Sequence, residues 1–412
     1  MKLVQFDGFP FVEGGITAAK GFSAAGLHCG IRANKSKKDL GLLVADHDCA
    51  AAGVYTLNKV KGAPIAVTKE HIADGSCRGV IVNSGIANTC NADGIEKAEG
   101  MCRIAAKATG LPEKSFAVAS TGVIGQPLPL EPIEASIGEL AGALSPENHA
   151  DFASAIMTTD TVMKEVAVEF TLGGKTCRIG GCAKGSGMIM PNMATMLCFL
   201  TTDAAISPEL LRLALKRVVD DTFNMVSVDG DTSTNDTVLL LASGDAGNEE
   251  IVRQDADFSR FANALYVVLM NLSRMIAADG EGATKLLECT VSGAESREQA
   301  AVVAKSVINS SLLKAAMFGA DANWGRVLCA VGYADTEVDV NLVDVTFASE
   351  NGAVAVCKKG AGIDFSEETA KTVLSADEVK ILVDLNDGAE TATAWGCDLT
   401  YDYVRINGDY RS

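Results

Sequence analysis

The stretch KGSGMIMPNMATMLCFLTTDA, residues 184–204, decides how this chain is interpreted. A glycine-rich segment leads through Pro191 to Thr195, and the apolar residues 196–200 follow at once. A short, continuous apolar run of this kind is typical of a buried strand. Thr195 therefore stands at the head of a predicted strand, which is where an N-terminal nucleophile has to be placed.

A threonine in that position can supply its own base. Its hydroxyl is a weak nucleophile until a base accepts the proton. If the peptide bond between Ala194 and Thr195 is broken, the freed α-amine has an unperturbed pKa of about 7.7–8 and can act as that base. The same hydroxyl can drive the cleavage by attacking the Ala194 carbonyl in an N→O acyl shift, which water completes. The pattern thus predicts autocleavage that exposes a threonine nucleophile.

Two simpler interpretations of this stretch stay open at this point. Threonine is common in strands, so Thr195 is also explained as an ordinary strand residue. The residues KGSG at 184–187 resemble a phosphate-binding loop, but the spacing G-x-x-x-x-G-K-[ST] is absent.

Composition and charge exclude several classes of partner. The chain has 412 residues, of which 48% are hydrophobic, and these values predict two or three domains with a large core. A formal net charge of −18 repels phosphate backbones and anionic lipid, which argues against nucleic acid and membranes. Residues 1–14 contain no apolar run of signal length, and the apolar region 261–278 is interrupted by Asn263, Asn271 and Arg274, as in a buried helix. We therefore expect a cytoplasmic protein.

The cysteines and histidines offer little support for metal or histidine chemistry. Twelve cysteines are spread along the chain without a C-x-x-C pair, so we expect reduced, mostly buried thiols and no structural metal. The four histidines all lie in the first 150 residues, and no G-x-S-x-G elbow is present. Any acyl chemistry is therefore expected to use a base other than histidine.

Helical and extended signals alternate throughout, which predicts a mixed α/β fold. Buried strands are predicted at 79–83, 117–119 and 238–242. Ser207 and Pro208 begin a predicted helix, because a serine cap followed by proline is a typical helix start. Helical spacing predicts a second helix over 298–317, and the turn at Asn386, Asp387 and Gly388 predicts a hairpin between 380–385 and 390–395.

Several segments together resemble the ornithine acetyltransferase family, and they occur in the family's order over essentially the whole chain. They are residues 183–203, NSGIANTCNADG at 83–94, ASTGVIG at 119–125, MTTDT at 157–161, DGDTSTNDTVLLLASG at 229–244, DGEGATK at 279–285 and FGADANWGRVLCAVG at 318–332. The resemblance implies an α/β sandwich of the N-terminal-nucleophile type that processes itself and assembles as an α2β2 heterotetramer. It divides the chain into an α chain, 1–194, a start of the β chain that completes the catalytic core, 195–285, and a C-terminal α/β domain, 286–412, whose tail returns to the active site.

The resemblance also assigns roles to individual positions. Thr195 matches the nucleophile, with cleavage between Ala194 and Thr195, and Thr121 and Gly122 match the oxyanion hole. A hydroxyl and a backbone N–H are suitable donors to a developing oxyanion. The positions that match substrate contacts are Thr158, Lys184, Thr195, Glu281, Asn407 and Ser412. Without the resemblance, these would be interpreted as turn, surface or tail residues.

The function implied is a ping-pong transfer of acetyl from N-acetylornithine to glutamate through an acetyl-threonine ester. No metal or organic cofactor is expected, and acetyl-coenzyme A is a candidate second donor. One alternative is a related aminopeptidase or amidase that hydrolyses with the same nucleophile. The other is a non-catalytic binding protein in which Thr195 is an ordinary strand residue.

Overall fold

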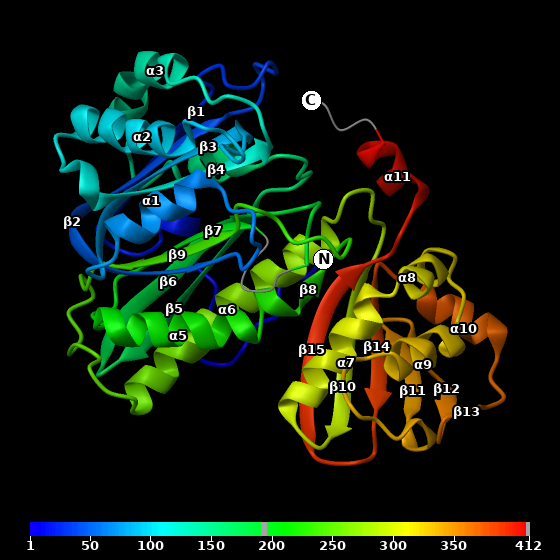
Figure 1. Ribbon diagram of the computed structural model, residues 1–412. Coiled ribbons are helices and arrows are strands. Elements are labelled where there is room, and N and C mark those ends of the chain that lie inside the picture. The colour runs from blue at the N-terminus through cyan, green and yellow to red at the C-terminus, as the bar shows by residue number, and fades with distance from the viewer. Residues whose placement is uncertain (191–195, 409–412) are drawn as a thin grey trace.

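The computed structural model describes residues 1–190 and 196–408 and contains two β-sheets with helices packed on both (Figure 1). The prediction of a mixed α/β fold is confirmed. The strands predicted at 79–83, 117–119 and 238–242 lie in β3, β4 and β9, and each of these runs is buried.

In the described part of the chain, the first sheet has eight strands in the order β4-β3-β2-β9-β7-β6-β5, with β1 paired to β2. They are β1 (Phe22–Leu27), β2 (Leu40–Tyr55), β3 (Ser76–Ile86), β4 (Phe116–Val123), β5 (Lys164–Leu172), β6 (Lys175–Lys184), β7 (Leu197–Thr202) and β9 (Thr237–Ala242). The long strand β2 belongs to both halves of this sheet. Residues 40–45 pair with β1 and residues 50–55 with β9, and its register with β3 shifts between Val44 and Cys49.

The two halves of this sheet face each other across a shared apolar core. Leu43 and Val80 from one half and Phe199 and Leu239 from the other belong to the same buried cluster, which also includes Phe152 of α4 (His149–Ile156). Helices α1 (Ala63–His71), α2 (Gly94–Thr109) and α3 (Glu131–Gly142) cover the outer face of the first half, and α5 (Pro208–Asp220) and α6 (Ala256–Ala278) cover the second (Figure 1). The result is the α/β sandwich expected from the sequence.

In the described residues, the second sheet has seven strands in the order β13-β12-β11-β14-β10-β15-β8. They are β8 (Val226–Ser227), β10 (Leu286–Ala294), β11 (Asp344–Ser349), β12 (Gly352–Lys358), β13 (Ala361–Gly362), β14 (Glu378–Asp384) and β15 (Glu390–Cys397). The associated helices are α7 (Arg297–Asn309), α8 (Ser311–Phe318), α9 (Trp324–Gly332), α10 (Glu367–Leu374) and the tail helix α11 (Tyr401–Asn407). Strands from both sides of residue 195 build the first sheet, and the three-part division at 194/195 and 285/286 stays a prediction.

Two predicted elements are wrong in detail. The hairpin does not form, because β10 lies between β14 and β15 and pairs parallel with the former and antiparallel with the latter. The helix predicted over 298–317 is two helices bent by 58°, because Ser310 leaves the helical backbone and its hydroxyl accepts a hydrogen bond from the Leu313 N–H at 3.3 Å.

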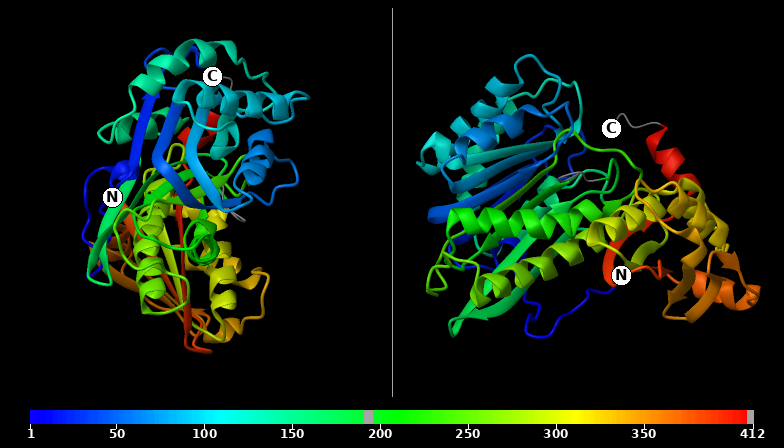
Figure 2. Two further views of the ribbon diagram at one scale, coloured as in Figure 1. Left: turned by 90° about the vertical axis from the view of Figure 1, so that its left-hand side faces the viewer. Right: turned by 60° about the horizontal axis from the view of Figure 1, so that its bottom comes forward.

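Helix α6 connects the two sheets. Among the described residues, α6 is the one unbroken helix that is long and apolar enough to cross a membrane. However, 72% of its most apolar 18-residue stretch is buried inside the protein. It packs against β5 and β6 of the first sheet and against β10 and β15 of the second, as the right-hand view of Figure 2 lets the reader follow. The prediction of a buried helix at 261–278 is confirmed, and α6 ends just before Asp279 and Glu281.

Candidate active site

One cavity of about 290 Å³ brings the predicted site residues together. Of the nine positions predicted, six line it: Thr121, Gly122, Thr158, Lys184, Glu281 and Asn407. The other three, Ala194, Thr195 and Ser412, lie outside the described residues. Met196, which follows Thr195 in the sequence, also lines the cavity. Residues separated by nearly 290 positions in the chain thus share one concave surface.

Thr121 and Gly122 lie at the end of β4, where this strand runs parallel to β3 and Gly122 faces Gly85. Gly122 has a φ of +132°, which side-chain-bearing residues rarely adopt. A Cβ on Gly122 would overlap the carbonyl group of Gly85 and lie 2.6 Å from the Ile86 nitrogen. Only glycine therefore fits at this position.

We expect Gly122→Ala to destabilise the protein by about 3 kcal/mol, since it combines backbone strain with overpacking. Chemical unfolding of the purified variants measures this change. Gly125→Ala is the matched control, because Gly125 also has a positive φ, +81°, but nothing lies within 4 Å of its added Cβ. Equal destabilisation by the two substitutions would contradict the close approach to Gly85.

Lys184 is the last residue of β6 and places a buried cation beside Thr121. Its Nζ donates to Thr121 Oγ1 at 3.3 Å, and the residue is 8% exposed. Burial lowers the pKa of Lys184 from its ordinary value, while the nearby carboxylates of Asp160 and Asp236 oppose this shift. Because the threonine oxygen accepts from Lys184, its own hydrogen can be donated into the cavity. The pair can thus stabilise negative charge on a bound carbonyl oxygen.

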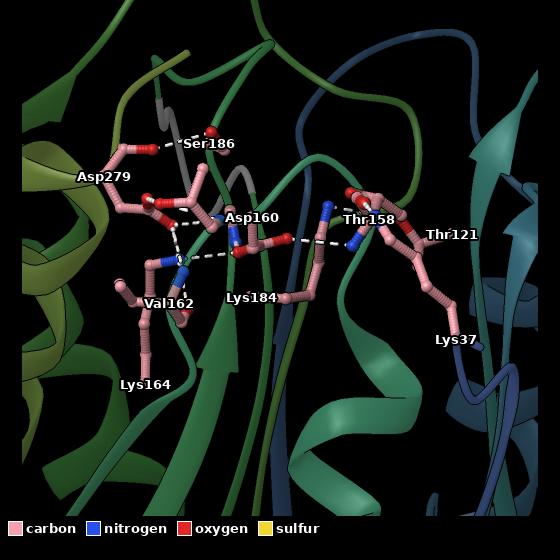
Figure 3. Close-up of polar contacts among 11 residues, drawn as sticks. Lys37, Thr121, Thr158, Asp160, Val162, Lys164, Lys184, Ser186 and Asp279 are labelled. Atoms are coloured by element: carbon pink, nitrogen blue, oxygen red, sulfur yellow. Dashed lines mark hydrogen bonds and ion pairs between the residues drawn. The ribbon is translucent and has the colours of Figure 1, made fainter. Parts of the chain in front are cut away.

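A buried ion-pair cluster lies beside Lys184 (Figure 3). Lys164 Nζ is 2.7 Å from Asp160 Oδ1 and 2.6 Å from Asp279 Oδ2, and the Lys164 and Asp160 side chains are fully buried. Burial alone would raise the pKa of Asp160, but the charges of Lys164 and Lys184 hold it well below its ordinary value. Asp160 is therefore an anion at neutral pH.

This cluster fixes the backbone of residues that line the cavity. Asp160 accepts hydrogen bonds from the Thr158 N–H at 2.9 Å and from the Gly185 N–H at 2.7 Å. Asp279 accepts from the N–H and the hydroxyl of Thr161. One buried lysine thus ties together the segment before β5, the end of β6 and the end of α6, and so positions Thr158 and Lys184.

Glu281 and Asn407 form another part of the cavity wall. Asn407 Nδ2 in α11 donates to Glu281 Oε2 at 2.7 Å, and the Glu281 N–H donates to the Ser186 carbonyl at 3.0 Å. A Cβ on Gly187 would overlap the Glu281 carboxyl group, so the glycine makes room for that side chain. The tail helix therefore reaches the cavity, and the hydrogen bond from Asn407 orients the Glu281 carboxylate there.

Asn235 and Asp236, which are not among the predicted site residues, also line the cavity. Asn235 Nδ2 donates to the carbonyls of Ala87 at 2.6 Å and Ser120 at 3.0 Å, so it holds the end of β4 in place. Burial raises the pKa of Asp236 well above its ordinary value, although the charge of Lys184 partly opposes this. Burial thus shifts both Asp236 and Lys184 toward their neutral forms.

The cluster of Asp160, Lys164 and Asp279 was not predicted from the sequence. Its one local signal is the spacing of four between Asp160 and Lys164 in DTVMK, which is also common on solvated helices. Lys164 and Asp279 are 115 positions apart, and a charged residue gives no sign in the sequence that it is fully buried.

Comparisons with known proteins show which family this chain belongs to. The profile of the ArgJ family matches residues 23–412. The "arginine biosynthesis bifunctional protein ArgJ 1" of Clostridium acetobutylicum is 51% identical over 399 residues, 96% of this chain and 97% of that protein. The ArgJ protein of Symbiobacterium thermophilum is 50% identical over 404 residues, 98% of this chain and 100% of its own length.

A solved structure is also similar to this chain. The crystal structure of the arginine biosynthesis bifunctional protein from Bacillus halodurans is 48% identical and aligns with a TM-score of 0.50. The match covers 52% of this chain and 99% of that one. With the family profile spanning nearly the whole sequence and the relatives matching from end to end, this chain is an enzyme of the ArgJ family.

Proposed function

We propose that this enzyme moves an acetyl group from N2-acetyl-L-ornithine to L-glutamate through an acetyl ester on Thr195. The observation that carries the proposal is the convergence of Thr121, Gly122, Lys184 and Glu281 on the cavity that Met196 also lines. The relatives named for arginine biosynthesis support a substrate of that class.

In the first half-reaction, the Thr195 hydroxyl attacks the acetyl carbonyl carbon and its proton passes to the Thr195 α-amine. The Thr121 hydroxyl, itself a hydrogen-bond acceptor from Lys184, and the Gly122 N–H donate to the oxyanion of the tetrahedral intermediate. The C–N bond then breaks, the departing α-nitrogen takes the proton, and ornithine leaves. An acetyl ester on the threonine oxygen remains.

In the second half-reaction, the α-amine of glutamate attacks the same carbonyl carbon. The oxyanion forms again against Thr121 and Gly122, and the attacking nitrogen passes a proton to the Thr195 α-amine. The bond to the threonine oxygen then breaks, and that oxygen takes the proton from the amine. The product is N-acetylglutamate, and the enzyme returns to its starting state. This route needs neither a metal nor an organic cofactor, and acetyl-coenzyme A would serve as a second donor by forming the same ester.

The proposal includes the maturation of the nucleophile. Attack of the Thr195 hydroxyl on the Ala194 carbonyl, followed by hydrolysis, yields an α chain of residues 1–194 and a β chain of 195–412. In the first sheet, β9 and β7 of the β chain lie between β2 and β6 of the α chain, so the fragments would stay associated after cleavage. Two copies of each would form the α2β2 heterotetramer in the cytoplasm, with residues 195–285 completing the catalytic core and 286–412 carrying the tail.

An assay of the purified wild-type protein tests the proposal. N-acetylornithine is supplied with or without glutamate, and ornithine and N-acetylglutamate are quantified. We expect equal amounts of both products with glutamate and little ornithine without it. Ornithine released at the same rate in water alone would identify a hydrolase instead. No release under either condition, together with an intact mass of one 42.8 kDa species, would favour the non-catalytic alternative.

A further inference from the structure

The proposed reaction requires one site to accept two amino acids whose side chains carry opposite charges. Ornithine ends in an ammonium group, which the Glu281 carboxylate can bind. Glutamate ends in a carboxylate, which Glu281 would repel, since like charges repel strongly at close range in a partly buried site. The acceptor therefore needs a different place for its side chain.

A second cavity of about 380 Å³ adjoins the first. The two share Gly122, Val123, Thr158 and Thr159 as lining residues. The second cavity is lined in addition by Arg32, Asn34, Lys37 and Gln126, and no acidic residue lines it among those described. A ligand whose reacting atoms lie at Gly122 can therefore extend toward Glu281 or toward Arg32 and Lys37.

The segment that forms this wall is rich in positive charge. Residues 32–38, RANKSKK, contain four cations and no acid in a chain with a net charge of −18. Lys37 Nζ donates to the Thr158 carbonyl at 3.3 Å, which places its ammonium beside a residue shared by both cavities. Figure 3 shows Lys37 approaching Thr158 from the side opposite Asp279. The charge of Arg32 also contributes to the lowered pKa of Lys184, so it acts on the catalytic cavity.

The cationic segment is held by a buried carboxylate. Asp39 is fully buried and accepts hydrogen bonds from the N–H groups of Cys29 at 2.6 Å, Gly30 at 3.3 Å and Arg32 at 2.9 Å. These bonds fix the backbone of residues 29–32, and the exposed Lys37 is directed to Thr158 by its own hydrogen bond. The positive charge of this wall is suited to an anionic group.

We propose that the side-chain carboxylate of the acceptor glutamate binds Lys37 in this second cavity, whereas the side-chain ammonium of the donor binds Glu281. The inference rests on the proposed function. Both substrates present the α-nitrogen to the acetyl carbon at Gly122, and rotation about the bond between that nitrogen and the α-carbon sends the two side chains to different walls. The negative charge at one wall then favours the donor side chain, and the positive charge at the other favours the acceptor side chain.

Steady-state kinetics of Lys37→Met tests the proposal. We expect the KM for glutamate to rise about tenfold or more, because a charge-assisted hydrogen bond to the acceptor is lost. Exchange of labelled ornithine into N-acetylornithine, which needs no glutamate, should stay within about twofold of wild type. The preference for glutamate over glutamine as acceptor should shrink, and Lys37→Arg should restore most of it.

Lys35→Met is the matched control, since Lys35 is exposed in the same segment and does not line the cavity. It should leave the KM for glutamate unchanged. An equal rise of the KM for both amino acids in Lys37→Met would assign the lysine to their common α-carboxylate and overturn the proposal. A rise confined to acetyl-coenzyme A would also overturn it by assigning the cavity to a phosphate-bearing donor. If the wild type transfers no acetyl group, the proposed function itself fails.

Discussion

The Thr195→Ala variant is expected to remain one 42.8 kDa chain and to lose acetyl transfer by a factor of at least about 10³. The substitution removes the hydroxyl that would attack the Ala194 carbonyl, so the scission has no nucleophile. It removes the acetyl acceptor at the same time, because the ester intermediate forms on that same oxygen. Intact mass spectrometry measures the scission, and the ornithine release assay measures the transfer.

Thr195→Ser distinguishes the need for the hydroxyl from the need for the threonine methyl group. It keeps a hydroxyl, so we expect scission and a measurable fraction of the transfer rate. Thr171→Ala serves as the control, since Thr171 is exposed on β5 and should leave both measurements unchanged. A Thr195→Ala protein that still splits and still exchanges acetyl groups would place the nucleophile elsewhere.

The second large effect is expected from Lys164→Met. The variant keeps most of the side-chain volume but leaves the buried carboxylates of Asp160 and Asp279 without the cation that they share at 2.7 and 2.6 Å. Removing one partner of a buried ion pair typically costs about 3–5 kcal/mol, because the remaining charge stays desolvated. The free energy of unfolding should fall by that amount, as chemical denaturation can measure.

Two further variants show whether the loss comes from this cluster. Lys175→Met removes an exposed lysine at the start of β6 and should change stability by less than about 0.5 kcal/mol. Adding Asp160→Asn and Asp279→Asn to Lys164→Met removes the unpaired charges and should recover part of the stability. If the triple variant is no more stable than Lys164→Met, unpaired charge is not the cause.

The same cluster explains an expected loss of activity in Lys164→Met. Asp160 holds the N–H groups of Thr158 and Gly185, and these residues flank the catalytic cavity. Without Lys164, the carboxylate is drawn toward the remaining cation of Lys184, which would displace that lysine from Thr121. We therefore expect a fall in kcat under conditions where the variant is still folded.

The sequence by itself determined several local elements and pointed to six of the residues that line the cavity. Ser207 and Pro208 begin α5 as predicted, and the serine hydroxyl accepts from the Leu210 N–H, because helix starts depend on neighbouring residues. Continuous apolar runs identified β3, β4 and β9. A strand that is buried on both faces is apolar at successive residues, and this can be recognised in its own sequence without knowing its neighbours. Family-like motifs alone pointed to Thr121, Gly122, Lys184 and Glu281.

The tertiary structure alone decided which of these elements are neighbours. β10 separates β14 from β15, although the turn between them is typical of a hairpin, because pairing depends on strands nearly a hundred positions away. The charged residues that support or extend the site were missed for a related reason. Lys164 at the centre of an ion-pair cluster and Lys37 at the wall of a second cavity look like ordinary surface lysines in the sequence, since burial and partners are set by the folded chain and not by local pattern.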